Sequence, residues 1–415
     1  MTPNKLFETA LGLSKPWNIE KIDFDANGRR LDIYIDFERG ATFEYIDKET
    51  GEVEQSTAYD TKNKEWRHLN FFEHECYIHS RTPRIKTANG KVKLINPPWA
   101  GLSNGFTLLF EAMAMQFCKH MPINTVAKLF SSNDKKLWKM VMAYTNEAHK
   151  ELDFSEVTQI GIDETSQCKG HDYVTLFVDM KERDGLFVAK GKDSKTVDDF
   201  SKVLEEQGGK SENITDVSID MSPAFIKGVH DNFPEAEITF DLFHLMKTIN
   251  KAVDKVRKSE VKTNEILKGT KYLFLKNHEN LTDKQKEELA GLSLKKLNLK
   301  TVRAMHIREN FQAIYSAKTE KAFIKLLKEW FYWATHSKLK PMIEAAHTIK
   351  NHWDGVVRWY SSQLNNGILE GLNSIIQSAK SKARGYKVFE YYRAIIYLLT
   401  ADLDFSKINP HIISN

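Results

Sequence analysis

At 415 residues, the chain is longer than one ordinary domain, and we expect two to four domains. Its composition, with 41% hydrophobic and 28% charged residues, is typical of a soluble globular protein. No apolar run is long enough to span a bilayer, and the first residues lack the layout of a signal peptide. These features argue against a membrane partner, and we expect a cytoplasmic protein.

The cysteine content argues against a disulfide-bonded protein, and the distribution of charge indicates which ligands the chain binds. Three scattered cysteines, Cys76, Cys118 and Cys168, give neither a disulfide framework nor a C-x-x-C pair. Residues 151–245 contain 21 Asp and Glu but 9 Lys and Arg, a net charge of −12, although the whole chain carries +4. An acidic segment between basic ones indicates a metal site set within polyanion-binding surfaces. Ordinary scatter of charge along the chain is the alternative.

The first 98 residues are predicted to form a β-rich module. Leu31, Ile33, Ile35 and Phe37 alternate with polar neighbours, which is the two-residue period of a half-buried strand. The preceding Asn27-Gly28 is a hairpin-turn signal. Further aromatic and branched residues continue the pattern until Pro97-Pro98.

Residues 99–150 change to helical spacing. A short helix over Thr125–Phe130, a turn at Ser131–Asp134 and a second helix over Lys135–Val141 give a helix-turn-helix layout. We interpret this region as DNA-binding, with Lys135 and Lys136 near the start of the reading helix. A plain helical hairpin fits the same pattern.

Residues 151–245 alternate strands with helices in the order βββαβαβ. This order is that of a ribonuclease H-like core, in which the first and fourth strands lie side by side. The expected strands are Gln159–Asp163, His171–Met180, Gly185–Lys190, Thr215–Asp220 and Ala236–Asp241, and the expected helices are Thr196–Gly208 and Pro223–Asn232. Asp163 and Asp220 would therefore meet at one edge of the sheet.

Three carboxylates form the pattern of a two-metal nuclease. Asp163 and Asp220 each end an apolar strand, and Glu370 opens a distant helix. Magnesium prefers hard oxygen ligands, and a pair of ions can activate the attacking oxygen and stabilise the leaving one. We therefore predict that these three residues are catalytic and hold two Mg²⁺ or Mn²⁺ ions. For either aspartate alone, a turn or cap residue after a strand would be the better interpretation.

Three neighbours are candidates for a supporting role. Glu164 follows Asp163 directly, so on a strand it points to the other face, and we interpret it as a supporting or structural residue. Asp241 ends the last strand and is a minor candidate for the same site. His244 is a candidate for contact with a scissile phosphate, or alternatively a core histidine.

Residues 246–360 are expected to form a helical insertion. Its first part is basic, since residues 245–280 alone carry a net charge of +5. Four tryptophans are expected in the core of the insertion, with base stacking as the alternative. They are Trp330, Trp333, Trp353 and Trp359.

Residues 361–415 are expected to form the second part of the core. They contain the Glu370 helix and a last helix over Val388–Leu399. Four basic residues that follow Glu370 are predicted to contact phosphates, with a solvated helix face as the alternative. They are Lys380, Lys382, Arg384 and Lys387.

Taken in order, the motifs GIDETSQCKGHDY, VSIDMSPAF, FDLFHLMK and NNGILEGLN…KARGY resemble the DDE transposases of bacterial insertion sequences, of the ISL-three family. The resemblance covers roughly residues 40–400. It implies that Asp163, Asp220 and Glu370 are the catalytic triad and that a helical domain is inserted before Glu370. It also implies binding to the terminal inverted repeats of an element, cleavage there, and joining of the 3′ hydroxyls to target DNA. Double-stranded DNA would then be the partner, and a homodimer or higher oligomer at the bacterial nucleoid would be the working form.

The sequence departs from that family in its N-terminal module. Members of the family carry paired cysteines there that form a zinc ribbon, but the matching stretches Glu44–Asp47 and Thr87–Gly90 contain no thiol. His74, Cys76 and His79 lack the fourth ligand that tetrahedral structural zinc needs. We therefore expect no zinc, and a zinc-ribbon-like module that folds on its apolar core.

Two other functions fit parts of the sequence. A structure-specific nuclease would use the same core, but has less need of the upstream β module and helix-turn-helix. An inactive DNA-binding protein derived from a transposase would not need Asp163, Asp220 and Glu370 together.

Overall fold

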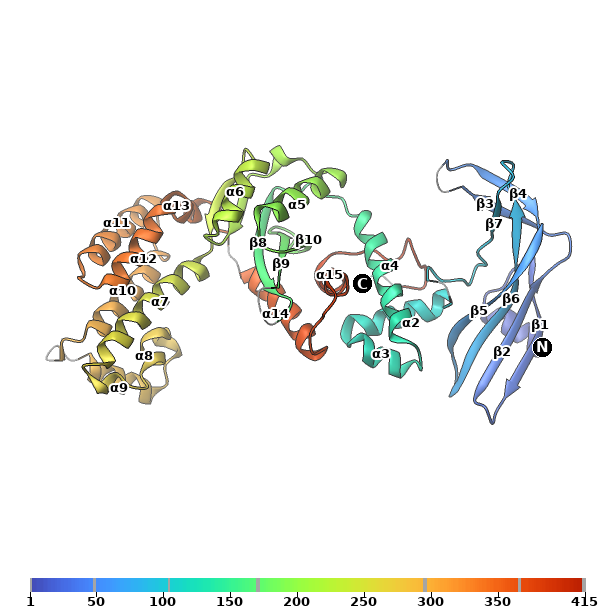
Figure 1. Cartoon of the computed structure of the whole chain (residues 1–415), viewed down its shortest axis with the longest axis horizontal. Coiled ribbons are helices and arrows are strands. Elements are labelled where there is room, and N and C mark those ends of the chain that lie inside the picture. Colours follow the sequence, from blue (N-terminus) through green and yellow to red (C-terminus); the bar gives the residue numbers. More distant parts are fainter. Residues whose placement is uncertain are drawn as a thin grey trace. The chain divides into compact units, whose positions relative to one another are not determined.

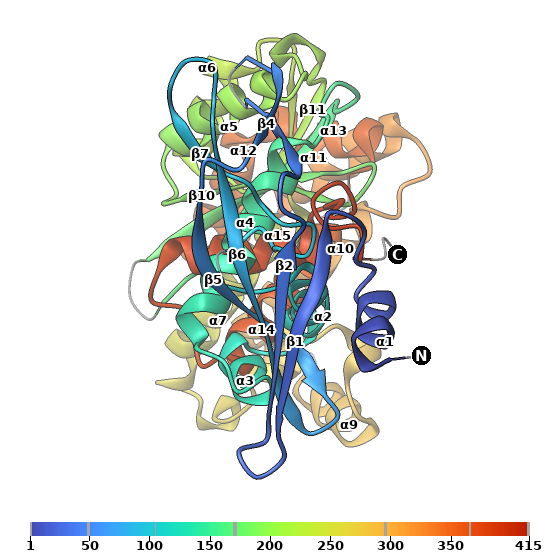
Figure 2. The same cartoon turned by 90° about the vertical axis from the view of Figure 1, so that its right-hand side faces the viewer.

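The computed structural model describes residues 2–47, 50–103, 105–168, 172–293, 297–364 and 367–412 (Figures 1 and 2). The chain forms two compact units. The first contains residues 1–151, 379–399 and 403–415, and the second contains residues 152–378 and 400–402. The predicted segment 361–415 is thus divided between the two units.

The first unit begins with a short helix and a β-sheet, as the alternation of apolar residues predicts. Leu31, Ile33 and Ile35 are buried on one face, together with Trp66 and Ile78. The main sheet has the order β1-β2-β6-β5, β7 pairs with β6, and β3 and β4 form a separate hairpin. The elements are α1 (Pro3–Ala10), β1 (Trp17–Asp25), β2 (Arg30–Phe37), β3 (Thr42–Ile46), β4 (Val53–Thr57), β5 (Asp60–Phe71), β6 (His74–Lys86) and β7 (Val92–Leu94).

Four helices complete the first unit: α2 (Leu108–His120), α3 (Ile123–Leu129), α4 (Asp134–Lys150) and most of α15 (Phe389–Thr400). The last of them packs against α4 through aromatic stacking. The rings of Trp138 and Tyr391 are 4.1 Å apart, as are those of His149 and Tyr397. These contacts between residues far apart in sequence explain why the C-terminal helix joins the N-terminal unit.

The second unit is built on a mixed five-stranded sheet with the order β10-β9-β8-β11-β12. β8, β11 and β12 are parallel, whereas β9 is antiparallel to both of its neighbours. The predicted order of strands and helices is confirmed, as is the pairing of the first strand with the fourth. The elements are β8 (Gln159–Ser166), β9 (Tyr173–Asp179), β10 (Gly185–Lys190), α5 (Ser194–Glu206), β11 (Asp216–Ile219), α6 (Pro223–Asn232) and β12 (Glu237–Phe240). His171, where the second strand was predicted to begin, lies outside the described residues.

A run of helices follows β12, as predicted. Its apolar core is continuous with that of the sheet, and Trp330 is fully buried within it and donates a hydrogen bond from Nε1 to the Ile307 carbonyl. Trp333, which we expected in this core, is 43% exposed. The helices are α7 (Leu242–Val261), α8 (Lys271–Leu275), α9 (Asp283–Leu292), α10 (Lys300–Ile314), α11 (Glu320–His336), α12 (Lys340–Asn351) and α13 (Trp353–Ser362). Among the residues described, no helix is long and apolar enough to cross a membrane.

Helix α14 (Gly367–Lys382) brings the chain back to the sheet. It packs on β8 at Gly161, where a Cβ atom would lie 2.9 Å from Leu369 Cδ1 and 2.5 Å from Met180 Sδ. A side chain at position 161 would force the ends of the Leu369 and Met180 side chains to move.

We expect Gly161→Val to destabilise the second unit by about 1–3 kcal/mol, because a branched side chain overpacks this contact. The same change should impair any activity that depends on the position of α14. Gly371→Ala, in the same helix and with open space at its Cβ, should stabilise the protein by up to about 1 kcal/mol. Thermal unfolding of both variants measures these changes in stability. Equal stability of Gly161→Val and the parent would contradict the packing argument.

Candidate active site

Three aspartates form a row across adjacent parallel strands. Ser218 pairs with Gly161 and Ile219 pairs with Phe240. Continued along the strands, these registers bring Asp220 level with Asp163 on one side and with Asp241 on the other. Neighbouring strands lie about 4.8 Å apart, so the three carboxyl groups gather at one edge of the sheet.

Asp163 differs in one respect from the prediction, which placed it at the end of its strand. β8 continues to Ser166 because its last residues pair with β9. β11, on the other side of β8, has already ended at Ile219, so Asp163 lies where the sheet opens on that side.

Helix α14 runs along β8 with matched spacing. Leu369 lies against Gly161, the Asn373 amide donates a 2.6 Å hydrogen bond to Asp163 Oδ2, and Gln377 donates to Thr165 Oγ1. Four helical residues rise about 6.0 Å and two strand residues about 6.6 Å, so the three contacts stay in step. Glu370 is exposed and lies one turn before Asn373, on the helix that touches Asp163.

The other carboxylates are held by local hydrogen bonds. Asp220 Oδ1 accepts from the Ser222 N–H at 2.9 Å. Asp241 Oδ1 accepts from the Phe243 N–H at 2.9 Å and so caps α7, while its Oδ2 lies 2.8 Å from Nδ1 of His244. Asp241 therefore fixes both the start of α7 and the orientation of the imidazole ring.

The electrostatics of these residues show that they share one environment. Burial raises the pKa of Asp163 to about 6, the charges of Asp241 and Asp220 add to the rise, and His244 opposes it. The hydrogen bond to Asp241 raises the pKa of His244, and the charges of Asp163 and Asp220 act in the same direction. The structure therefore brings together Asp163, Asp220, Asp241 and His244.

Glu164 lies next to this group of three aspartates and His244. Burial raises its pKa, Asp220 and Asp163 add to the rise, and Lys192 opposes it. The Lys192 ammonium lies 3.7 Å from Glu164 Oε2 and above the ring of Tyr173. Glu164 thus links the acidic row to a basic side chain near the end of β10.

Oxygen atoms of carboxylates and amides dominate this edge of the sheet. Within the part of the chain that the structure describes, no three His, Cys, Asp or Glu side chains converge closely enough to hold a metal ion as they stand. However, Asn373 Oδ1 is buried without a hydrogen-bond partner in the described residues, beside the carboxylate of Asp163. Several carboxylates and an unsatisfied amide oxygen are the donor chemistry that a hard divalent cation takes. The residues present therefore fit such an ion chemically.

The histidine and cysteine cluster of the N-terminal module has a different geometry. His74, Cys76 and His79 all lie on β6, where successive side chains alternate between faces. Cys76 faces the buried core, whereas His79 Nε2 lies 2.6 Å from Asp32 on the other face. Burial also raises the pKa of the Cys76 thiol to about 12. These three side chains cannot meet on one ion without disrupting the sheet.

Comparison with known proteins gives the family. A family model of ISL3 transposases, described as a transposase, matches residues 160–396, which is more than half of the chain. The chain belongs to the ISL3 family of insertion-sequence transposases. It is 26% identical over 410 residues to the transposase for insertion sequence element IS1001 of Bordetella parapertussis, covering 94% of this chain and 97% of that protein. It is 24% identical over 419 residues to the transposase for insertion sequence element IS1557 of Mycobacterium tuberculosis, covering 92% of each chain.

The basic residues predicted to bind DNA lie in the first unit of this transposase. Lys135 and Lys136 are exposed in the first turn of α4, which Asn133 caps. Their contact with DNA stays a prediction, as does that of the four basic residues near the end of α14. Of these, Lys380 and Lys382 lie in the last turn of α14, while Arg384 and Lys387 follow it, Arg384 with a φ of 61°.

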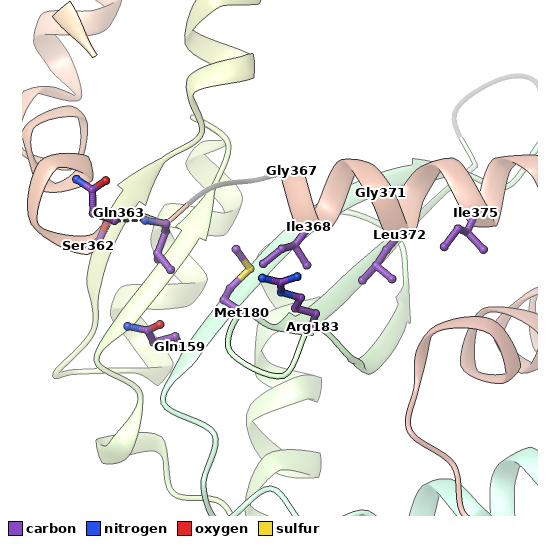
Figure 3. A pocket seen from close by; sticks show the side chains of 11 residues that line it. Gln159, Met180, Arg183, Ser362, Gln363, Gly367, Ile368, Gly371, Leu372 and Ile375 are labelled. Carbon is purple, nitrogen blue, oxygen red and sulfur yellow. Dashed lines mark hydrogen bonds between the residues drawn. The ribbon is translucent and has the colours of Figure 1, made fainter. Parts of the chain in front are cut away.

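A separate pocket of about 660 Å³ opens beside the start of α14 (Figure 3). Ile368 and Leu372 project from one side of the helix above Met180 and Arg183. Asp163, Asp220 and Glu370 do not line this pocket. The pocket and the carboxylate row therefore lie on different sides of α14.

Two residues of the candidate site were missed by the sequence analysis, namely Asn373 and Gln377. Both are polar residues on a helix that is otherwise apolar toward the sheet. Their signal is the four-residue spacing Leu369, Asn373, Gln377, which puts one apolar and two amide side chains on the face that meets β8. Asn365 and Asn366, which open the same motif, lie outside the described residues.

Proposed function

We propose that this chain is a DDE transposase with a ribonuclease H-like catalytic core. Asp163, Asp220 and Glu370 would hold two Mg²⁺ or Mn²⁺ ions at the edge of the sheet. The observation that carries the proposal is the seating of α14 along β8, since Glu370 lies one turn from an amide bonded to Asp163, and Asp163 is level with Asp220. The strand order β10-β9-β8-β11-β12, with β9 antiparallel, supports the assignment of the core.

In this proposal the carboxylates would bind the metal ions and His244 would contact the phosphate. The ions, when bound, would activate the attacking oxygen and stabilise the leaving one in an in-line displacement. Asp163 and Asp220 provide rigid carboxylates on adjacent strands, and Glu370 provides a third from a separate helix. Asp241 holds His244 by hydrogen bond and favours its cationic form, which suits contact with a scissile phosphate.

The substrate would be the terminal inverted repeats of an insertion sequence, followed by target DNA. The first unit would recognise the ends through a helix-turn-helix made of α3 and α4, with Lys135 and Lys136 on the reading helix. Lys380, Lys382, Arg384 and Lys387 would contact phosphates near the catalytic helix. We infer a homodimer or higher oligomer on DNA at the bacterial nucleoid, because two ends must be processed together.

An assay with end DNA tests the proposal directly. Purified protein with Mg²⁺ should nick a duplex that carries an inverted repeat and join its 3′ hydroxyl to a plasmid. Cleavage without joining and without preference for the repeat would instead identify a nuclease. Selective binding of the repeat without any cleavage would identify an inactive descendant of a transposase.

Helix α7 carries a basic face in the second unit that we also propose contacts DNA. It starts at Asp241 in the carboxylate row, and its buried face packs on α10 and α12. Lys247, Lys251 and Lys255 are exposed at four-residue spacing on the opposite face, and none forms an ion pair within the described residues. Residues 246–360 as a whole carry 24 Lys and Arg against 12 Asp and Glu. We propose that a DNA strand leaving the carboxylate row follows this line of lysine ammonium groups.

We expect the triple replacement of Lys247, Lys251 and Lys255 by alanine to weaken DNA binding uniformly across sequences. The slope of log K against log salt should fall by about 0.9 for each phosphate that the variant no longer neutralises. The same change at Lys321, Lys325 and Lys328 of α11 alters the net charge equally and serves as the control. Equal slopes for the two triple variants would contradict a specific path along α7.

A further inference from the structure

The side-chain amide of Asn373 forms a hydrogen bond through its nitrogen but has none at its oxygen. Its Nδ2 donates the 2.6 Å hydrogen bond to Asp163 Oδ2, yet its Oδ1 is buried and has no partner in the described residues. A buried acceptor without a donor is unfavourable, because the group has lost its water and gained nothing in return. Such a group in a native protein takes its partner from outside the chain, either a water molecule or an ion.

The surroundings of Asn373 favour a cation as this partner. The oxygens of Asp163, Asp220 and Asp241 already accept hydrogen bonds from backbone N–H groups and from His244 and Asn373. Near Asp163, acceptors and negative charge therefore outnumber donors. A protein donor for Asn373 Oδ1 is missing from this group, whereas a cation would satisfy the amide oxygen and the carboxylates together.

The helix places Asn373 correctly for this purpose. Residues three apart on an α-helix are neighbours on its surface, so Asn373 lies beside Glu370. One turn further on, the Gln377 amide bonds to Thr165, which anchors α14 beyond the carboxylate row. The two amides therefore differ in position, since only Asn373 touches a carboxylate.

We propose that Asn373 is a fourth member of the metal site. Its N–H group holds the Asp163 carboxylate in place, and its Oδ1 supplies an oxygen toward the divalent ions that Asp163 and Glu370 hold. This inference rests on the proposed function of the carboxylate row. It predicts that removal of the amide lowers the affinity for metal even when no DNA is present.

Binding of Mn²⁺ alone to the full chain, followed by electron paramagnetic resonance of the free ion, tests this role. Asn373→Ala should weaken binding about 10–100-fold, which is the usual effect of losing a group that orients or supports a metal ligand. Ser374→Ala, at an exposed position on the same helix, is the control and should bind Mn²⁺ within about twofold of the parent. Asn373→Asp retains an oxygen at the same place and should keep most of the affinity.

The outcomes separate this inference from the proposed function. If Asp163→Asn abolishes Mn²⁺ binding while Asn373→Ala binds like the parent, the role of Asn373 is wrong and the carboxylate site stands. If Asp163→Asn binds Mn²⁺ normally, the proposed metal site itself is wrong. If Asn373→Asp loses as much affinity as Asn373→Ala, the oxygen is not a ligand. If Asn373→Ala is unfolded, the comparison of Asn373→Asp with Ser374→Ala decides the question.

Discussion

Replacement of Asp163, Asp220 or Glu370 by alanine should each reduce strand cleavage by about a thousandfold or more. Loss of a ligand removes a metal ion that contributes several kcal/mol to the transition state, and about 1.4 kcal/mol corresponds to a factor of ten in rate. Binding of DNA should be largely retained, because the basic surfaces remain. A plasmid excision assay and a gel-shift assay on the same variants measure the two effects.

Asp231→Ala provides a control for these variants. Asp231 is an exposed aspartate on α6 in the same unit, and its removal changes the net charge equally. We expect its cleavage rate to stay within about twofold of the parent, since surface changes away from a site have small effects. Normal excision by Asp220→Ala would show that the three carboxylates do not form the catalytic group.

Recognition of the element ends should be lost when the start of α4 changes charge. Lys135→Glu combined with Lys136→Glu should weaken binding of end DNA by about a hundredfold, because each contact of this kind contributes about 1–3 kcal/mol. Competition between end DNA and random DNA in a binding assay measures the change in selectivity. These substitutions are preferable to deletion of residues 1–151, which would strip α15 of the aromatic stacking between Trp138 and Tyr391.

The double variant Lys119→Glu and Lys150→Glu is the matched control in the same unit. Lys119 lies in the last turn of α2, and Lys150 pairs with Glu147 at the end of α4. The control should bind end DNA nearly as the parent does. If both double variants lose binding equally, the effect reflects net charge and not a reading helix.

The sheet of the second unit was predictable because its signals are local. Each strand of the second unit is a short apolar run, and the order of strands and helices allows few topologies. The meeting of Asp163 and Asp220 followed from that order, since parallel neighbours end at the same edge, whereas Asp241 was a minor candidate. The extension of β8 past Asp163 was missed because residues 164–166 are polar, and only their pairing with β9 makes them part of the strand.

Other features depend on contacts that the sequence does not express. The assignment of α15 to the first unit rests on stacking of Trp138 with Tyr391 and of His149 with Tyr397, across about 250 residues. Trp333 shares the helical spacing of a buried tryptophan, yet it lies on the exposed side of α11. Asn373 carries no motif of its own, and only the hydrogen bond to Asp163 distinguishes it from any other polar helical residue.

Anomalous diffraction from crystals of the transposase with end DNA and Mn²⁺ tests the central claim most directly. We expect two manganese peaks about 3.5–4 Å apart at the edge of the β8–β11 sheet, with Asp163, Asp220 and Glu370 among the ligands. Bonds from oxygen to each ion should be close to the lengths that hard cations show in proteins. Manganese bound elsewhere, or Glu370 more than about 12 Å from both aspartates in that complex, would contradict the two-metal account of this chain.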